Sequence, residues 1–294
     1  MTFVSNLING ISLGSVYAII ALGYTMVYGI AKMLNFAHGD VIMVGAYMAF
    51  VASSWLGINP LLAVLIAIVV CTLLGVLIER FAYKPLRNAS TLAVLITAIG
   101  MSYLLQNAAL LIFGSNPKTF TSITADIPSV SLFDGSLIIT SESIVTVVAC
   151  IIIMVGLTIF TKKSKMGKAM RAVSEDKDAA ELMGINVNVT ISVTFAIGSA
   201  LAAIAGVLLC SAYPVLIPTT GSMPGIKAFT AAVFGGIGSI PGAMLGGILL
   251  GIIEIFAKSY ISTQLSDAIV FAVLIIVLLV KPTGLLGKKI REKV

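Results

Sequence analysis

The stretch VIMVGAYMAFVASSWLGINPLLAVLIAIVVCTLLGVLI, residues 41–78, contains no charged side chain. One helical crossing of a bilayer needs about 17–25 apolar residues, so this run is too long for a single span. Trp55, Gly57, Asn59 and Pro60 interrupt it with residue types that are typical of a turn. The stretch therefore predicts two membrane-spanning segments joined by a tight turn.

The rest of the chain has the same character as this stretch. Of its 294 residues, 59% are hydrophobic and only 10% are charged, and the mean hydropathy is +1.12. A soluble domain carries about 25% charged residues, so this chain has too little polar surface to cover a core of its size. The composition predicts an integral membrane protein and excludes a soluble globule and a disordered chain.

Further uncharged runs are long enough to cross a membrane. They cover residues 1–31, 89–112, 143–161, 185–210 and 268–280, and a run over 228–253 is interrupted by the glycine-rich sequence GGIGSIPG at 235–242. We expect an all-α polytopic membrane protein, a single transmembrane domain over residues 1–294. It should have about eight to nine membrane segments, some of them broken or re-entrant.

The charged residues give these spans an orientation. Most of the 18 lysines and arginines lie in three clusters at 80–87, 162–177 and 281–293, whereas the polar segment 114–142 has one lysine against three acidic residues. The positive-inside rule places the three clusters in the cytoplasm and the segment 114–142 outside. Three spans precede the first cluster, so the N-terminus is expected outside, and the C-terminus is expected in the cytoplasm.

The segment MGKAMRAVSEDKDAAELMGINVNVT, residues 166–190, is the substantial polar stretch on the expected cytoplasmic side. It mixes charged residues with alanine, leucine and methionine, which favour helices, and Gly184 stands where a helix-ending glycine would lie. It predicts one or two short amphipathic helices parallel to the membrane plane. The alternative is a solvated connector.

Three separated segments of the chain resemble one family. The DAA sequence at 178–180, followed after three residues by Gly184, resembles the EAA loop of ATP-binding-cassette (ABC) importer permeases. Asp stands here for the usual Glu, and the I-x-L-P ending of the best-known version is absent. The runs at 6–47, which contains NFAHG, and at 231–254 are similar to segments of the branched-chain amino acid permease family. The chain therefore resembles the H-type membrane subunit of that family.

The resemblance implies a permease subunit of an ABC importer for branched-chain amino acids in the cytoplasmic (inner) membrane of a prokaryote. Urea or short amides are alternative substrates, because related systems carry them. The implied partners are a homologous second permease subunit forming a heterodimer, two cytoplasmic ATPase subunits and an extracytoplasmic amino-acid-binding protein, with no nucleic acid. The sequence contains no G-x-x-x-x-G-K-[ST] P-loop. The chain is therefore expected to be no enzyme and to need no cofactor, with ATP bound by the partner subunits.

The resemblance also assigns coupling to the ATPases to the cytoplasmic loop at about 162–184. Charged residues there would orient the docking, and small or apolar residues would supply the buried contact. The candidate coupling residues are Arg171, Glu175, Asp176, Asp178, Ala179, Ala180, Leu182, Met183 and Gly184.

A second candidate site lies between two apolar runs, where Asn35, His38, Gly39 and Asp40 occur together. Charged groups at membrane depth are costly unless they pair or line an aqueous cavity. The group predicts either a broken helix near the translocation path or an interfacial turn with a satisfied histidine. His38 is the sole histidine of the chain, and the three cysteines are far apart in apolar runs, so no metal site is expected.

The glycine-rich late segment is a third candidate, for packing or hinge motion. Its small residues at four-residue spacing allow helix backbones to approach closely. Glu254 and Lys258 are four apart on the same helical face and are expected to pair. The candidate hinge or packing residues are Gly235, Gly236, Gly238, Pro241, Gly242 and Gly246.

Two other classes of protein are compatible with the composition. An ion-coupled secondary transporter would need acidic residues within the membrane in both halves of the chain, and the candidates are Asp40 and Glu254. A membrane scaffold without transport activity gives no reason for a helical cytoplasmic loop of this spacing. The importer subunit accounts for more of the sequence than either.

Overall fold

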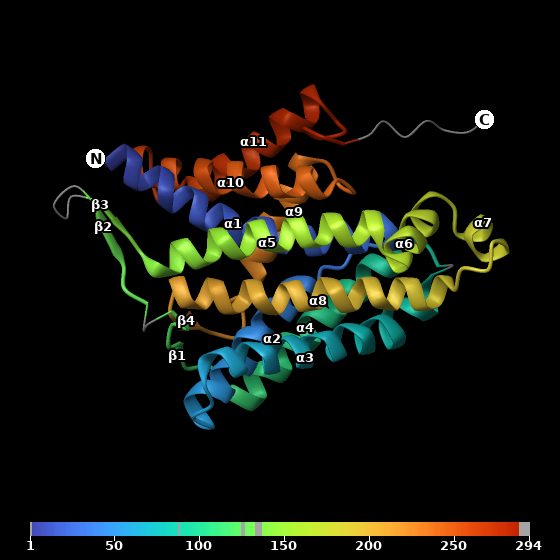
Figure 1. Cartoon of the computed structure of the whole chain (residues 1–294), viewed down its shortest axis with the longest axis horizontal. Helices are drawn as coiled ribbons and strands as arrows, with labels where there is room; N and C mark the ends of the chain where they lie inside the picture. The colour runs from blue at the N-terminus through green and yellow to red at the C-terminus, as the bar shows by residue number, and fades with distance from the viewer. Residues whose placement is uncertain (1, 88, 125–126, 133–136, 288–294) are drawn as a thin grey trace.

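The computed structural model describes residues 2–87, 89–124, 127–132 and 137–287. Several charged residues used above lie outside the described residues, namely Asp126, Asp134, Lys288, Lys289, Arg291 and Lys293. Figure 1 shows a bundle of helices with the N-terminus at one end.

Six helices are long and apolar enough to cross a membrane: α1 (Thr2–Ala31), α3 (Pro60–Ile78), α4 (Thr91–Phe113), α5 (Ser141–Lys163), α8 (Val187–Ala212) and α10 (Ile240–Tyr260). Three shorter helices accompany them: α2 (His38–Phe50), continued by the π-helical turn η1 (Val51–Trp55), α9 (Ser222–Gly235) and α11 (Ser266–Val280). Within the described ranges these nine segments agree with the predicted eight to nine, and the fold is all-α as expected.

The predicted basic clusters lie at one end of the bundle, which we call the basic end. It contains η2 (Glu79–Tyr83), η3 (Lys84–Leu86), α6 (Lys165–Glu175), α7 (Lys177–Leu182) and, at the end of α11, Lys281. Arg87 contacts Asn188 at the start of α8, and Lys177 contacts Ala31 at the end of α1. The clusters therefore share one side, as the positive-inside rule requires of them.

The opposite end of the bundle holds the N-terminus and four short strands (Figure 1). β1 (Lys118–Thr119) pairs antiparallel with β4 (Val215–Leu216), and β2 (Val130–Leu132) pairs antiparallel with β3 (Leu137–Ile139). The first pairing joins the segment after α4 to the segment after α8, so it fixes two spans that are distant in the sequence.

Side-chain caps set where several helices begin. Asn59 accepts a hydrogen bond from the backbone N–H of Leu61, and Pro60 occupies the first turn of α3. Both residues belong to the turn predicted within residues 41–78, and both types are favoured at these positions. Ser90 and Asn186 cap α4 and α8 in the same way.

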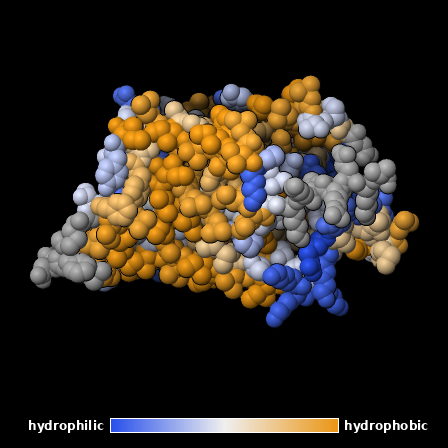
Figure 2. Space-filling view, turned by 90° about the horizontal axis from the view of Figure 1, so that it is seen from above, coloured by the Kyte–Doolittle hydropathy of each residue, from blue (hydrophilic) through white to orange (hydrophobic). Residues whose placement is uncertain are grey.

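The helices form a buried interior and an outer layer. In the most apolar stretch of α1, 89% of the residues are buried, whereas in that of α4 only 11% of the residues are buried. Figure 2 shows hydrophobic side chains over most of one face, with hydrophilic side chains gathered toward the end that carries α6 and α7. A surface of this kind is compatible with lipid and not with water.

Glycines bring α1 and α10 together in antiparallel orientation. Gly14 lies against Ile248, and a Cβ atom on Gly14 would be 2.6 Å from the Cα atom of Ile248. Gly247 packs against Ala18 on the same face. Small residues in this segment therefore allow the two helix backbones to pack closely.

The last described segment folds back onto the bundle. After α11 ends, the backbone N–H groups of Leu285 and Leu286 donate to the carbonyl oxygens of Phe234 and Gly235, each at 2.9 Å. These bonds satisfy backbone groups at the end of α9, which would otherwise be costly at membrane depth.

Candidate functional site

Two of the shorter helices begin inside the bundle. Residues 32–37 have no helical structure, and α2 then begins at His38 among buried neighbours. Gly39 in its first turn lies against Gly221, the residue before α9, and a Cβ atom on Gly39 would be 2.8 Å from the carbonyl oxygen of Gly221. Gly225 approaches Gly39 from the next turn of α9. The N-termini of α2 and α9 therefore meet at what we call the central crossing.

The break before α2 starts with an unusual backbone conformation. Lys32 has φ of 58°, in the left-handed region that residues with a Cβ atom rarely occupy. Its N–H donates to the carbonyl oxygen of Tyr28 at 3.0 Å, which ends α1. Asn35, further along the break, accepts a hydrogen bond from the Tyr83 hydroxyl at 2.9 Å. The break is thus held at both ends.

A polar contact joins the two helix starts. Gln106 of α4 donates to Asp40 Oδ1 at 2.8 Å and lies 3.2 Å from the hydroxyl of Ser222. Asp40 is buried in the first turn of α2, where the helix dipole favours a negative charge. Gln106 was not predicted as a site residue, because a lone amide within an apolar run carries no spacing signal.

His38 distinguishes the two interpretations of this segment. Its side chain is 1% exposed, and among the described residues neither ring nitrogen has a hydrogen-bond partner. Its ring lies 4.5 Å from that of Tyr24, edge to face, and Gly23 leaves the room for it. A satisfied histidine in an interfacial turn does not match this burial. The structure has a break in the helix here, which matches one of the two interpretations, and its place near the translocation path stays a prediction.

The glycine-rich segment also breaks as predicted. Residues 236–239 separate α9 from α10, with φ of 105° at Gly236 and 91° at Gly238. Gly235 and Gly242 face each other across this break. Gly246 lies against the last turn of α9, which ends at Gly235. Pro241 stands in the first turn of α10, where it loses no intrahelical hydrogen bond.

A buried ion-pair group links α1, α9 and α10 toward the end opposite the basic end. Glu254 accepts hydrogen bonds from Lys258 at 2.6 Å, Lys227 at 2.8 Å and the Tyr17 hydroxyl at 2.8 Å. The pair with Lys258 was predicted from spacing. Lys227 and Tyr17 could not be predicted as its partners, because they lie on other helices. Lys227 also pairs with Asp267 at 2.6 Å.

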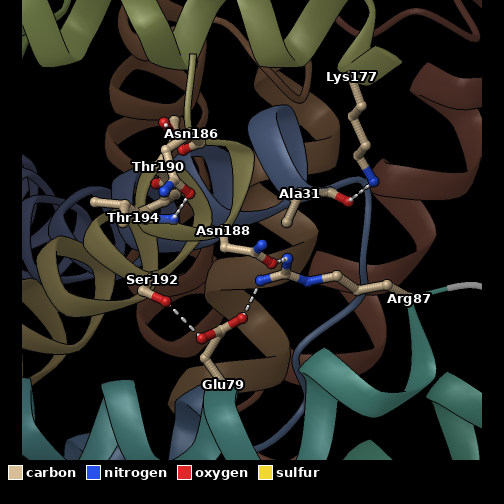
Figure 3. A network of polar contacts seen from close by, with 10 residues as sticks. Ala31, Glu79, Arg87, Lys177, Asn186, Asn188, Thr190, Ser192 and Thr194 are labelled. Carbon is tan, nitrogen blue, oxygen red and sulfur yellow. Dashed lines mark hydrogen bonds and ion pairs between the residues drawn. The ribbon is translucent and has the colours of Figure 1, made fainter. Parts of the chain in front are cut away.

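A second buried carboxylate lies at the basic end (Figure 3). Glu79 pairs with Arg87 and accepts a hydrogen bond from the Ser192 hydroxyl at 2.7 Å. Arg87 also donates to Asn188, so η2, the segment after η3 and α8 are tied together. Glu79 was not predicted as a site residue, although its position directly before a basic cluster indicates an ion pair.

Lys177 anchors the polar loop to α1, as Figure 3 also shows. Its ammonium group donates to the carbonyl oxygen of Ala31 at 3.1 Å, at the last residue of α1. Burial lowers the pKa of Lys177, and the nearby Arg87 and Lys32 lower it further. The contact places α7 next to the break that precedes α2.

The polar loop itself forms two short helices, as predicted. Ser164 accepts a hydrogen bond from the N–H of Gly167 at 2.8 Å and starts α6. Asp176 accepts from the N–H groups of Asp178 and Ala179, both at 3.0 Å, and starts α7. The buried residues of α6 are Gly167, Met170 and Val173, on one face, so the helix is amphipathic.

The end of α7 projects from the protein. Leu182 is 89% exposed and Met183 is 82% exposed, and Gly184 follows with φ of 79° and open space around it. We call residues 182–184 the α7 tip. Ala180, another candidate coupling residue, is buried within this chain and does not belong to its exposed surface.

The remaining candidate coupling residues are exposed, namely Arg171, Glu175, Asp176, Asp178 and Ala179. Arg171 donates to the carbonyl oxygen of Lys162 at 3.3 Å, which holds α6 against the end of α5. The loop therefore presents charged residues along two capped helices and an apolar tip at their end.

Residues 6–278 match the model of a family described as branched-chain amino acid transport system, permease component. The chain is 48% identical to the high-affinity branched-chain amino acid transport system permease protein LivH of Salmonella typhimurium, over 99% of this chain and 98% of that protein. It is 47% identical to the corresponding protein BraD of Pseudomonas aeruginosa, with the same coverage. A solved structure, PsaBC from Streptococcus pneumoniae in complex with Fab, gives a TM-score of 0.49 at 16% identity and covers 96% of this chain and 93% of its own.

Proposed function

Since the chain belongs to the branched-chain amino acid permease family, we propose that it is the membrane-spanning subunit of an ABC importer for branched-chain amino acids. It lies in the cytoplasmic membrane of a prokaryote, with the basic end in the cytoplasm and the N-terminus outside. Separate ATPase subunits hydrolyse ATP, a homologous second permease completes the pore, and an extracytoplasmic binding protein delivers the amino acid.

The observation that carries this proposal is the α7 tip. Leu182 and Met183 are almost fully exposed at the end of α7, which lies at the basic end (Figure 1). When a partner buries large apolar side chains of a short, capped helix, the complex with that partner is stabilised. A cytoplasmic ATPase with a groove for α6 and α7 is such a partner. The exposed charges of α6 and α7 then orient the docking.

The contacts around Lys177 supply a route from the tip to the interior. A displacement of α7 acts on the carbonyl group of Ala31, and the next residue, Lys32, begins the break before α2. The break leads to the central crossing at Gly39 and Gly221. Movement of the ATPases is therefore transmitted to α2 and α9, the two helices that meet at the central crossing. This requires that the ATPases bind the two states of the permease unequally, because equal binding shifts no equilibrium.

The interior suits the proposed cargo. The helices around the central crossing are largely apolar, with a few polar groups such as Gln106 and Ser222, so an aliphatic amino acid meets few unpaired charges on the way. The names of the relatives support the same class of substrate.

Reconstitution tests the proposal. The chain is co-expressed with the genes that neighbour its own, purified by a tag on the chain and placed in liposomes together with the binding protein. We expect P-loop ATPases to copurify, and leucine uptake to require ATP on the side of the basic end. Leucine uptake by the purified chain alone, in vesicles without any ATPase, would overturn the proposal.

A further inference from the structure

A cavity of about 230 Å³ lies toward the end of the bundle opposite the basic end. Its lining comes from α1, α8, α9 and α10, together with β4. Sites for drug-sized molecules measure about 300–1,000 Å³, so this cavity suits a smaller ligand, such as one amino acid. It is separate from the central crossing, because none of Gly39, Asp40 and Gly221 lines it.

Charged groups of both signs line this cavity. Glu254 is buried and holds the ammonium groups of Lys227 and Lys258 within 2.8 Å. Lys258 keeps 35% of its side chain exposed, and Lys227 has a second carboxylate partner in Asp267. Charges at membrane depth are stable where they pair or line an aqueous cavity, and these do both.

Apolar side chains form much of the remaining lining. Leu13 and Leu209 are buried, and Val215 and Met223 are exposed. The cavity thus combines a positive group, a negative group and an aliphatic surface within one small volume. An ion pair whose only task was to hold helices together would need neither the cavity nor the apolar lining.

We propose that this cavity binds an aliphatic amino acid as the zwitterion, a step that rests on the proposed function and adds the site to it. The α-carboxylate binds the ammonium group of Lys258, and the α-ammonium group binds the carboxylate of Glu254. Lys227 keeps its neutralising contact with Asp267 while Glu254 is shared. The side chain of the amino acid packs against Leu209 and Met223.

The position of the cavity fits this task. With the basic end in the cytoplasm, the cavity lies on the outer side of the membrane, where a delivered amino acid would first contact the permease. The lining residues come from four helices, so a bound amino acid contacts all four of them at once. The site is therefore an entry site that precedes the central crossing.

A single introduced cysteine reports occupancy of the cavity. The three native cysteines, Cys71, Cys150 and Cys210, are buried, so they give little background. The complete importer with Met223→Cys is placed in liposomes, and the rate of modification by a membrane-impermeant thiol reagent is measured with and without leucine. A matched control carries Ile138→Cys, an exposed position of β3 outside the cavity.

We expect leucine at ten times its dissociation constant to slow modification of the thiol at position 223 by about tenfold, and to leave the control unchanged. The analogues 4-methylpentanoate and leucinamide each lack one charged group. We expect each to need a concentration about tenfold higher for equal protection, because one charge-assisted contact is lost. Equal protection by leucine and both analogues would overturn the zwitterion site.

A second variant removes Lys258, the proposed partner of the α-carboxylate of the amino acid, without blocking the cavity. In the background of Met223→Cys, we expect Lys258→Met to reduce protection by the same concentration of leucine from about tenfold to about twofold, because the affinity falls about tenfold. The thiol should react at its usual rate when leucine is absent. In Met223→Cys alone, a thiol that never reacts, or that leucine does not protect, would overturn the site. Full protection by leucine in the Lys258→Met variant would overturn it as well. Leucine uptake by liposomes with the unmodified importer is measured in parallel. Uptake without protection refutes this site alone, and protection without ATP-dependent uptake refutes the proposed function alone.

Discussion

The glycines of the interior and the glycine of the α7 tip meet different physical requirements. In the interior, Gly14 and Gly39 bring backbones so close that a Cβ atom would lie within 2.8 Å of the neighbouring backbone. At the tip, Gly184 has open space around it but a φ of 79°. The first requirement is room and the second is backbone conformation. The interior glycines therefore serve contacts within the chain, whereas a Cβ atom at Gly184 would meet no neighbour.

The largest effect is expected from filling the interior. Gly14→Val forces a branched side chain onto the backbone of Ile248, and overpacking of this kind costs about 3 kcal/mol. This corresponds to a fall in Tm of roughly 6–12 °C, measured by thermal unfolding of the purified protein in detergent.

The matched control for Gly14→Val is Gly156→Val in α5, which also changes a helical glycine to valine. No atom would lie within 4 Å of a Cβ atom there. Its Tm should stay at or slightly above that of the original chain, because valine has a better helix propensity than glycine. Equal losses of Tm in both variants would refute the packing explanation.

The tip should respond in the opposite manner. Gly184→Val forces a branched residue into the left-handed region and changes the direction in which the chain leaves α7, while the interior keeps its contacts. We expect leucine transported per ATP hydrolysed to fall by at least about tenfold, because the exit of the chain from α7 changes. Strained positions of this kind cost about 1–3 kcal/mol, so Tm should fall by no more than in Gly14→Val.

Gly184→Asn is the control for this change, because Asn adopts a positive φ more readily than other residues with a Cβ atom. Its coupling ratio should stay near that of the original chain. If the two variants couple equally well, the conformation at residue 184 has no part in transmission. If Gly184→Val yields less folded protein than Gly14→Val, Gly184 is needed for stability in the same way as the interior glycines.

A smaller effect is expected from trimming the tip. Leu182→Ala removes apolar surface that a partner would bury, which is worth about 1–2 kcal/mol. The affinity of the permease for its ATPases, measured by light scattering or pull-down titration, should fall by about five- to thirtyfold. Leu111→Ala on α4 is the control, since Leu111 is 86% exposed but lies among lipid-facing side chains. Equal losses of affinity would show that Leu182 is not at the docking surface.

The smallest effect is expected from Lys177→Met. It removes one hydrogen bond to Ala31, worth about 0.5–1.5 kcal/mol, while α6 keeps its own contacts. Leucine transported per ATP should fall by about two- to thirteenfold, with ATPase binding unchanged. Lys168→Met, which removes an exposed charge of α6, should leave leucine transported per ATP unchanged. A loss of ATPase binding in Lys177→Met would place Lys177 in the docking surface rather than on the route to α2.

The sequence predicted the spans closely because apolar length and charge decide where a helix can cross. The run at 89–112 became α4 (Thr91–Phe113), and the run at 143–161 became α5 (Ser141–Lys163). The helix caps and the glycine after α7 were predictable for a similar reason, because their chemistry acts over a few residues.

Contacts between distant segments could not be predicted in this way. The sequence indicated a break at Asn35 to Gly39, but nothing in it pointed to Gly221 as the partner. It indicated the pair of Glu254 and Lys258 but neither Lys227 nor Tyr17. Such contacts depend on how the helices pack, and local spacing carries no signal for that.

The length of α11 bears on the membrane around the protein. Its 15 residues rise about 22 Å, against a hydrocarbon thickness of about 30 Å, whereas the 19 residues of α3 rise about 28 Å. Its outward residues Leu279 and Val280 are exposed near the returning backbone of Leu285 and Leu286. Lipid beside α11 therefore has a shorter hydrophobic length to match than lipid beside α3. We therefore expect a thinner bilayer on the flank of α11, with short-chain lipids enriched there.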